Sequence, residues 1–346
     1  MELQADRWEH GSHSHELADE GVPSFPWRTG DVRLHGTGRH SLAALLAYAR
    51  PARVFAPRYY CPEVFETIRQ GKVDLVYYND MPTAPLRPPP GLRDGDAWLR
   101  CNTLGLRGEY PAEAVPAGVI LIDDHSHDLL SNWALAEEPH YAFASLRKTL
   151  PLADGGALWS PRGLDLPTEA ALTARHAHAV RERLRAMELK ARYLAGDAVA
   201  PEEFRRPLVR SEAELGHGDV SAISPESAAR LVRCPTVHWR ARRARNFAVL
   251  HAAIPTAPVK VLLPDQGAVP FVLTLVAEDE AQRERLRHAL IAQRVYPAIL
   301  WSLDVAEIGT EAASLGASVL CIQIDQRYDD ADMEQVGAVL REVLAA

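Results

Sequence analysis

The segment ASLRKTLPLADGG, residues 144–156, places Lys148 between an apolar stretch and an Asp-Gly-Gly turn. Lysine is rare in this chain and occurs only as Lys72, Lys148, Lys190 and Lys260. A solvated surface position is the ordinary interpretation of an isolated lysine. Here the residue follows the apolar run YAFAS, which predicts a place at the mouth of a sheet. Partly desolvated beside cationic Arg147, its amine would serve as a nucleophile that forms a Schiff base with an aldehyde.

The lysine segment belongs to a series of short apolar runs. ARVFAP, VDLVYY, AWLRCN, GVILID, YAFAS and GALWS are each bounded by turn residues or charges. Such runs predict strands buried on both faces, as in a mostly parallel sheet covered by helices. CPEVFETIRQG predicts a helix between two of the strands, and SLAALLAYAR predicts a helix whose entrance, GTGRH, is polar and rich in glycine. The sequence therefore predicts an α/β fold.

The chain divides into three predicted parts. Residues 1–30 form an N-terminal arm, in which HGSHSH holds His10, His13 and His15; a metal site is one interpretation, but a solvated arm is favoured. Residues 31–240 carry the apolar runs and then helical sequence rich in Arg, Ala and Glu. A long helix near TVHWRARRARNFAVLHAAI leads into a smaller domain, 241–346, where FVLTLVAED, AQRERLRHALIAQRV and SVLCIQI alternate strand, helix and strand.

Composition excludes several classes of protein. The 346 residues, 47% of them hydrophobic, suffice for a large core. A formal charge of -8 with dispersed arginines predicts no nucleic-acid partner. No apolar run approaches the ~18 residues of a membrane span, and the N-terminus lacks a signal-peptide core, so we expect a cytoplasmic protein with no membrane partner. The isolated Cys61, Cys101, Cys234 and Cys321 fit reduced thiols better than disulfides or a zinc site.

Three polar segments fall where strands of the predicted sheet end. They are GTGRHSL (36–42), LIDDHSHD (121–128) and SLRKTLPLADGG (145–156). In an open α/β sheet, the strand ends and the following helix N-termini form the ligand crevice, so these segments can converge. Gly38 to Ser41 offer backbone N–H groups that can hold a phosphate, although such a turn is often only structural. GTGRHS lacks the third glycine of a dinucleotide-binding turn.

The acidic and histidine-rich segment allows more than one interpretation. Alternation along an extended chain places Asp124 and Ser126 on one face and His125 and His127 on the other. Histidine and aspartate are common metal ligands, and a cap or surface cluster is a further alternative. Ligands so close in sequence need a turn to converge, and no distant cysteine or glutamate partner is evident. We therefore predict no metal site.

Taken together, these segments resemble the DegT/DnrJ/EryC1 aminotransferases, which are fold-type I enzymes dependent on pyridoxal 5'-phosphate (PLP). GRHSLAALL is similar to the family's Gly-x-x-Ala-Leu helix start, LIDDHSHDLL to its Glu-Asp-Ala-Ala-Gln/His segment, and SLRKTLPLADGG to its Lys followed by Gly-Glu-Gly-Gly. RRARNFAVL resembles its Arg-x-x-Asn helix, and RVYPAILW and DQRYDDADMEQV its closing segments. The resemblance spans roughly residues 30–340. It implies a mostly parallel seven-stranded sheet with helices on both faces, plus a smaller C-terminal α/β domain.

The resemblance also implies roles for individual residues. Lys148 would form the Schiff base with PLP and move the substrate proton, while Asp124 would pair with the pyridine nitrogen. His127 would lie near the ring hydroxyl and Ser126 against the ring. Gly38, Arg39, Ser145 and Arg147 are the candidate phosphate ligands, and Tyr60 or Cys61, in PRYYCPE, would supply the group that stacks on the ring.

Three residues are candidates for substrate contact. Arg327 can grip a carboxylate or phosphate by two parallel hydrogen bonds, but a surface ion pair with Asp325 or Asp329 is an equal alternative. Tyr296 and Trp301 would line the substrate mouth, although aromatic residues in an apolar run are more often part of the core.

The chain departs from the family pattern at three positions. Asp154 replaces the glutamate of the Gly-Gly turn, Arg147 stands where serine or threonine is usual, and His125 replaces a small residue. These departures leave the fold prediction intact and weaken any assignment of a nucleotide-linked keto-sugar as substrate.

The implied activity is PLP-dependent transfer of an amino group from an amino acid to a keto-sugar or other small carbonyl acceptor, in a homodimer. A PLP-dependent lyase, dehydratase or decarboxylase is one alternative, because the same electron sink serves all these reactions. A family member that binds PLP without turnover is another.

Overall fold

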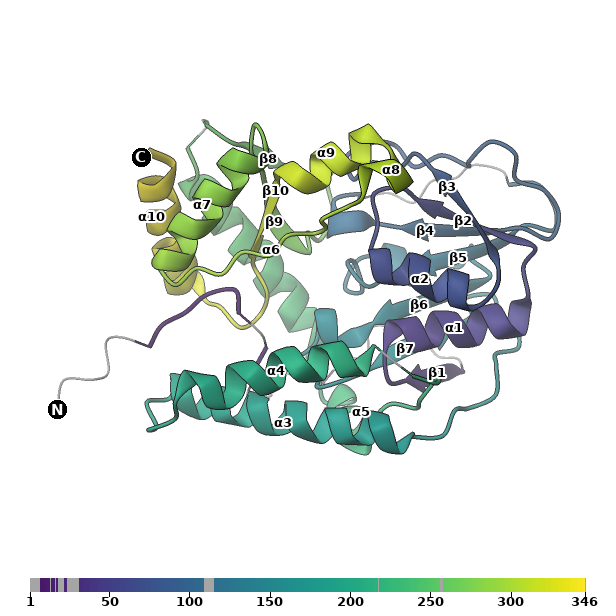
Figure 1. Cartoon of the computed structure of the whole chain (residues 1–346), viewed down its shortest axis with the longest axis horizontal. Helices are drawn as coiled ribbons and strands as arrows, with labels where there is room; N and C mark the ends of the chain where they lie inside the picture. The colour runs from purple at the N-terminus through teal and green to yellow at the C-terminus, as the bar shows by residue number, and fades with distance from the viewer. Residues whose placement is uncertain are drawn as a thin grey trace.

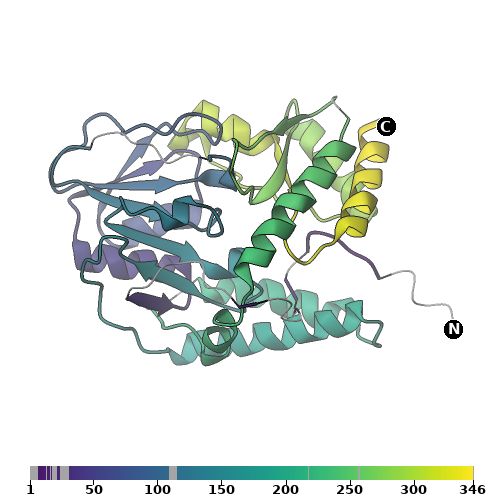
Figure 2. The same cartoon turned by 180° about the vertical axis from the view of Figure 1, so that it is seen from behind.

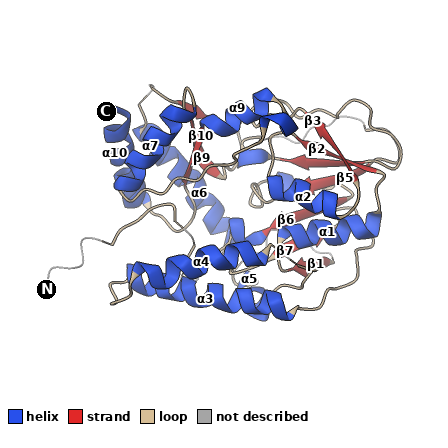
Figure 3. Cartoon of the chain, in the orientation of Figure 1, coloured by secondary structure: helices blue, strands red, loops and turns tan. Residues whose placement is uncertain are grey.

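The computed structural model of the chain describes residues 7–12, 14–15, 17, 22–23, 31–108, 115–216, 218–255 and 258–345. Over these ranges the strands form a seven-stranded sheet and a three-stranded sheet, with helices packed around both (Figures 1 and 3). The described helices include none with the length and apolar character that a membrane span requires.

The large sheet is mostly parallel, as predicted. Its strands are β1 (Val32–His35), β2 (Arg53–Pro57), β3 (Asp74–Tyr78), β4 (Ala97–Cys101), β5 (Ile120–Asp124), β6 (Tyr141–Ser145) and β7 (Gly156–Trp159), in the order β1-β7-β6-β5-β4-β2-β3. Only β7 runs antiparallel to its neighbours, β1 and β6. The apolar runs predicted six of these strands. No apolar run marks β1 in the sequence, because VRLH is short and half of its residues are polar.

Helices cover both faces of the large sheet, because neighbouring residues of a strand point to opposite sides. On β6, Phe143 packs with residues of α1 (Gly38–Ala49) and α2 (Pro62–Gln70). Ala142 and Ala144 pack instead with Leu231 of α5 (Pro225–Leu231) and Trp239 of α6 (Thr236–Ala253). The predicted two-sided covering is therefore confirmed. The remaining helices of this part, α3 (Ala174–Leu194) and α4 (Pro201–Leu215), lie side by side (Figures 1 and 2).

The smaller sheet is antiparallel and consists of β8 (Lys260–Leu262), β9 (Val272–Val276) and β10 (Val319–Gln323). Around it lie α6, α7 (Glu280–Ala292) and α10 (Asp330–Ala345). Two further helices, α8 (Val305–Ile308) and α9 (Thr310–Ser318), place Ile308 and Ala312 in the core of the large sheet. Figure 2 shows α6 running between the two sheets. The boundary expected at residues 240–241 thus falls inside a continuous helix.

The prediction of a solvated N-terminal arm is wrong for residues 7–12. His10 is 0% exposed, and its Nε2 lies 2.8 Å from the carbonyl oxygen of Gln323. Glu9 is also buried and lies 3.3 Å from the ammonium of Lys190. The segment packs because its backbone and side chains find partners on both parts of the molecule. His13 lies outside the described residues.

Candidate active site

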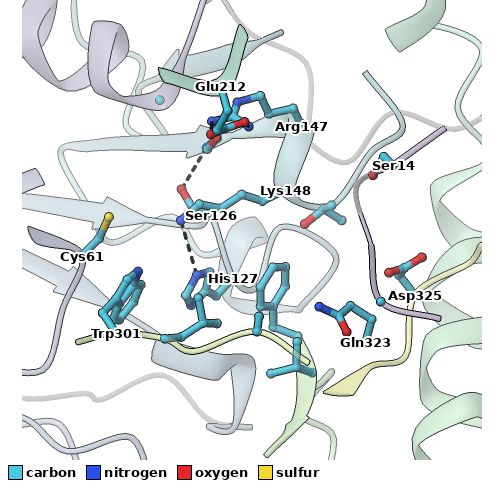
Figure 4. Close-up of a pocket in the computed structure, with 18 of the residues that line it drawn as sticks. Ser14, Cys61, Ser126, His127, Arg147, Lys148, Glu212, Trp301, Gln323 and Asp325 are labelled. Atoms are coloured by element: carbon cyan, nitrogen blue, oxygen red, sulfur yellow. Dashed lines mark hydrogen bonds and ion pairs between the residues drawn. The ribbon is translucent and has the colours of Figure 1, made fainter. Parts of the chain in front are cut away.

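A cavity of about 920 Å³ lies where β5 and β6 end, and residues from both sheets contribute to its walls (Figure 4). The predicted site residues that line it are Gly38, Arg39, Cys61, Asp124, Ser126, His127, Ser145, Arg147, Lys148, Tyr296, Trp301 and Arg327. Tyr60 does not line it. The three polar segments therefore converge, as their places at strand ends predicted.

Lys148 stands at the mouth of this cavity, on a short turn (Leu146–Lys148) directly after β6. Its Nζ lies 3.4 Å from His127 Nε2 and 5.9 Å from the centre of the Trp301 ring (Figure 4). The expectation that burial desolvates this lysine is wrong, because the side chain is exposed at the open mouth. The guanidinium of the neighbouring Arg147 is turned to the carboxylate of Glu212, 2.6 Å away.

Asp124 is the last residue of β5 and is buried. Its Oδ1 accepts a hydrogen bond of 2.8 Å from the backbone N–H of Ser126, and its Oδ2 accepts one from the Tyr60 hydroxyl. Burial and the Asp124 charge raise the pKa of Tyr60 well above its usual value. The hydroxyl therefore keeps its proton and donates a hydrogen bond to the carboxylate. Of the two stacking candidates, only Cys61 lines the cavity. Tyr60 is buried in the core and contacts Asp124 from the side away from the cavity.

Replacing Tyr60 by phenylalanine is expected to lower the free energy of unfolding by about 1.5–3 kcal/mol, since it removes a donor to a buried carboxylate. Tyr78→Phe is the matched control, because the buried Tyr78 hydroxyl donates to a neutral acceptor, the carbonyl of Leu99 at 2.9 Å. Its expected loss is about 0.5–1.5 kcal/mol. Urea unfolding of the two variants measures both losses, and equal losses would show that Tyr60 does not hold a charged group.

His127 lies between two other rings, those of Phe271 at 4.4 Å and Trp301 at 5.4 Å between ring centres. Burial, and then the charges of Lys148 and Arg243, lower the pKa of His127 well below its usual value. The imidazole is therefore neutral at physiological pH. Because its Nδ1 accepts from the backbone N–H of Leu104 at 3.3 Å, we assign the ring proton to Nε2, the atom that faces Lys148.

The other polar side chains of the acidic segment form hydrogen bonds with one another and with the neighbouring strand. His125 Nδ1 lies 2.8 Å from Asp128, and Asp123 accepts from the buried guanidinium of Arg100 at 2.7 Å. The described part of the chain has no group of three or more His, Cys, Asp or Glu side chains arranged to hold a metal.

The predicted phosphate ligands gather at the N-terminus of α1. Thr37 caps this helix through a hydrogen bond from the backbone N–H of His40, which leaves the N–H groups of Gly38 and Arg39 at the helix entrance. A Cβ atom at Gly38 would lie 3.0 Å from the backbone nitrogen of Ser145, so glycine lets these two segments approach each other. Arg147, in contrast, already shares Glu212 with Arg183, which is 2.9 Å from that carboxylate.

Of the predicted substrate residues, Arg327 already has partners. Its Nε and Nη2 each lie 2.7 Å from an oxygen of Asp325, and its Nη1 donates to the carbonyl of Ser12 at 2.6 Å. The ion pair predicted as the alternative thus exists with Asp325, but it is half-buried in the cavity wall rather than at the open surface. Tyr296 and Trp301 are half-buried in the cavity wall.

Asp154 holds the loop that follows Lys148 in place through hydrogen bonds of its side chain. Its carboxylate accepts from the Ser224 hydroxyl at 2.7 Å and the Ser224 backbone N–H at 2.8 Å, and it lies 2.9 Å from His176 Nε2. The side chain is completely buried. This carboxylate therefore connects the Asp-Gly-Gly turn to the N-cap of α5 and to the first turn of α3.

Asp154→Asn is expected to lower the free energy of unfolding by about 1–3 kcal/mol, because one acceptor oxygen becomes a donor that faces other donors. The control is Asp197→Asn, which alters an exposed pair with Arg192 and is expected to change stability little. Denaturant unfolding compares them. An Asp154→Asn protein as stable as the parent would contradict the role given to this carboxylate.

Several cavity residues were not singled out from the sequence. Phe271, Arg183 and Glu212 are far from the motifs, and nothing in their helical or apolar surroundings marks them. Arg243 carries the only usable signal, since it is the arginine of the quoted Arg-x-x-Asn pattern. The asparagine of that pattern, Asn246, binds the carbonyls of Ile324, Asp325 and Tyr328 at 2.9–3.2 Å.

Comparisons with known proteins bear on the fold. No family model and no curated protein matches the chain. Among solved structures, the sugar aminotransferase CalS13 from Micromonospora echinospora is 12% identical, with a TM-score of 0.56 and coverage of 90% of this chain and 87% of that one. The aminotransferase TlmJ from Streptoalloteichus hindustanus is 17% identical, with a TM-score of 0.58 and coverage of 91% and 86%.

A third structure similar to this chain is a DegT DnrJ EryC1 StrS aminotransferase from Brucella abortus. It is 14% identical, with a TM-score of 0.52 and coverage of 91% of this chain and 86% of that one. These likenesses confirm the predicted fold-type I architecture. The structures that share it include a member of the family that the sequence resembles.

Proposed function

We propose that this protein is a PLP-dependent aminotransferase that moves an amino group from an amino acid to a small carbonyl or keto-sugar acceptor. One observation carries the proposal. An exposed lysine amine, Lys148, and a buried carboxylate, Asp124, face the same cavity of about 920 Å³ in a fold shared with aminotransferases.

The residues of the cavity fit the ring and the phosphate of PLP. For the ring, the cavity offers Lys148 for the aldehyde and Asp124 for the pyridine nitrogen, which lies across the ring from the aldehyde. For the phosphate, it offers the start of α1 at Gly38 and Arg39, where backbone N–H groups and the helix dipole favour an anion. When bound, PLP supplies an electron sink for the substrate carbon that bears the amino group.

The protein's own residues would bind, orient and transfer protons. Lys148 would carry the proton between carbon and cofactor, since its amine is exposed to the cavity. Asp124 would keep one orientation, because Ser126 and Tyr60 fix its two oxygens. His127, neutral and clamped between two rings, would present an N–H at a fixed position beside the lysine. Trp301 would cover the same region and exclude water.

Other PLP chemistry remains the alternative, because Lys148 and Asp124 would serve elimination, dehydration or decarboxylation equally well. A protein that binds PLP without turnover is a further alternative. Transfer of a nitrogen-15 label from an amino acid to an acceptor separates transamination from the other reactions. A competent half-reaction with L-glutamate excludes the protein without turnover.

The proposal extends to organisation. We expect a homodimer that works in the cytoplasm on small molecules, with a cofactor-binding domain at 31–240 and a smaller domain at 241–346. Light scattering of the purified protein tests the dimer.

The decisive experiment is a visible spectrum of the protein with added PLP, before and after borohydride, followed by mass mapping of the modified lysine. A visible band that reduction fixes on Lys148 supports the proposal. No band, or a label on Lys72, Lys190 or Lys260, overturns it.

A further inference from the structure

The turn that follows β5, residues 125–128, is closed by a pair of buried side chains. His125 Nδ1 lies 2.8 Å from Asp128 Oδ1, and both residues are almost completely buried. The backbone N–H of Asp128 also donates to the carbonyl of His125, at 3.3 Å. Neither residue lines the cavity, but Ser126 and His127, which lie between them in the sequence, both do (Figure 4). The His125–Asp128 pair therefore closes a turn whose two central residues belong to the site.

The same turn contacts the other candidate residues of the site. The backbone N–H of Ser126 donates to Asp124 at 2.8 Å, and the Ser126 hydroxyl accepts from the backbone N–H of Ser145 at 2.9 Å. His127 Nε2 lies 3.4 Å from Lys148 Nζ. A change in the conformation of the turn would therefore move contacts of both the buried carboxylate and the cavity amine.

Both members of the pair are also fixed from outside the turn. The His125 ring stacks on that of Trp159 in β7, with 5.6 Å between ring centres and an interplanar angle of 24°. The second oxygen of Asp128 accepts from the Ser131 hydroxyl at 3.1 Å. Because each partner has a fixed position, the hydrogen bond between them holds the turn in one conformation.

Charge strengthens this hydrogen bond. His125 Nε2 lies 3.9 Å from Asp123, whose carboxylate is bound by the buried guanidinium of Arg100. Burial disfavours the charged form of the His125 ring, but three carboxylates outweigh burial and raise its pKa above the usual value. They belong to Asp128, Asp123 and Asp124. A hydrogen bond between charged partners is roughly twice as strong as a neutral one.

His127 needs support from its own backbone. Its ring is stacked between Phe271 and Trp301. Stacking fixes the plane of a ring more closely than its position within that plane, since stacked rings occur over a range of offsets. The turn therefore decides how far Nε2 of His127 reaches toward Lys148.

We propose that His125 and Asp128 are positioning residues, which hold His127 beside Lys148 by closing the turn between them. This inference rests on the proposed function, in which His127 acts next to the lysine. The family that the sequence resembles has a small residue where this chain has His125, so the pair is a departure from the family pattern.

The variants separate this role from a general loss of stability. His125→Ala combined with Asp128→Asn removes the hydrogen bond without leaving an unpaired carboxylate in the interior. Asp128→Asn alone is the conservative variant, because the amide oxygen can still accept from the imidazole. His10→Ala is the matched control, since His10 is equally buried, bonds a backbone carbonyl and does not line the cavity.

The first measurement needs no cofactor. The pKa of His127 is followed by NMR in histidine-labelled protein, and its signal is identified by its loss in His127→Gln. In the parent we expect a pKa well below the usual value. In the double variant it should rise by about one pH unit or more toward 6.5, because the ring loses its fixed place among buried groups. Asp128→Asn and His10→Ala should keep the low pKa.

The second measurement follows the visible band of the PLP-loaded protein against pH. The double variant should shift the midpoint of this titration in the same direction as His127→Gln. Adding His127→Gln to the double variant should produce no further shift, because residues that act through one another are not additive. Asp128→Asn and His10→Ala should leave the midpoint unchanged.

The outcomes are distinct. An unchanged His127 pKa in the folded double variant, or a shift of the band that adds to the shift of His127→Gln, would overturn the inference. If the double variant does not fold, Asp128→Leu removes the acceptor while filling its space and takes the same two measurements. A parent without any PLP band overturns the proposed function instead, and the NMR titration then still decides whether the pair positions His127.

Discussion

Lys148→Ala is expected to abolish the visible PLP band and to lower kcat/KM for amino transfer by at least ~10³-fold. The reason is that Lys148 is the only lysine that lines the cavity among the residues that the structure describes, so no other described amine can replace it. Absorbance of the PLP-loaded protein and a coupled assay with L-glutamate measure the two effects. Stability should change little, because the side chain is exposed.

The matched control for this variant is Lys72→Ala, which removes an exposed lysine outside the cavity and should keep both band and activity. Lys148→Arg keeps the positive charge without a usable amine and should behave like the alanine variant. A Lys148→Ala protein that loses the band but keeps full activity would contradict the proposed role of Lys148.

Acid should destabilise the protein strongly below pH 6.5, because three buried histidines resist protonation. Burial lowers the pKa of His10, His35 and His40 to about 4 each. In the unfolded chain these residues titrate near pH 6.5, so between pH 6.5 and 4 the unfolded state binds more protons. The free energy of unfolding then falls as the pH falls, by ~1.4 kcal/mol per pH unit for each histidine. Several kcal/mol is a large share of the stability of an ordinary domain.

Urea unfolding at pH values from 8 to 5 measures this loss. His35→Gln should flatten the dependence on pH, whereas His288→Gln should not, since His288 is largely exposed. A free energy of unfolding that stays constant from pH 7 to pH 5 would contradict the prediction.

The local part of the fold was readable from the sequence. Apolar runs bounded by turns predicted six strands of the large sheet, because a strand buried on both faces needs apolar side chains on both. The polar segments at the strand ends predicted where Asp124 and Lys148 meet, because parallel strands end at one edge. These inferences need only neighbours in sequence and a general rule of topology.

The features that depend on packing between distant segments could not be predicted from the sequence. The burial of His10 depends on partners such as Gln323 at the far end of the chain, so a polar histidine-rich stretch is typical of an exposed arm until those partners are known. The turning of Arg147 to Glu212 likewise depends on α4, which no motif connects to the lysine segment.

The contact between Ser12 and Arg327 joins residues 315 positions apart and places two distant segments of the sequence in one wall of the cavity. Chain synthesis delivers Ser12 long before Arg327, and contacts of such high sequence separation form slowly. The β5 and β6 ends that hold Asp124 and Lys148 can meet long before that wall closes. During biosynthesis, Asp124 and Lys148 therefore leave the ribosome well before Arg327, and the wall that Ser12 and Arg327 share can close only after residue 327 has been made.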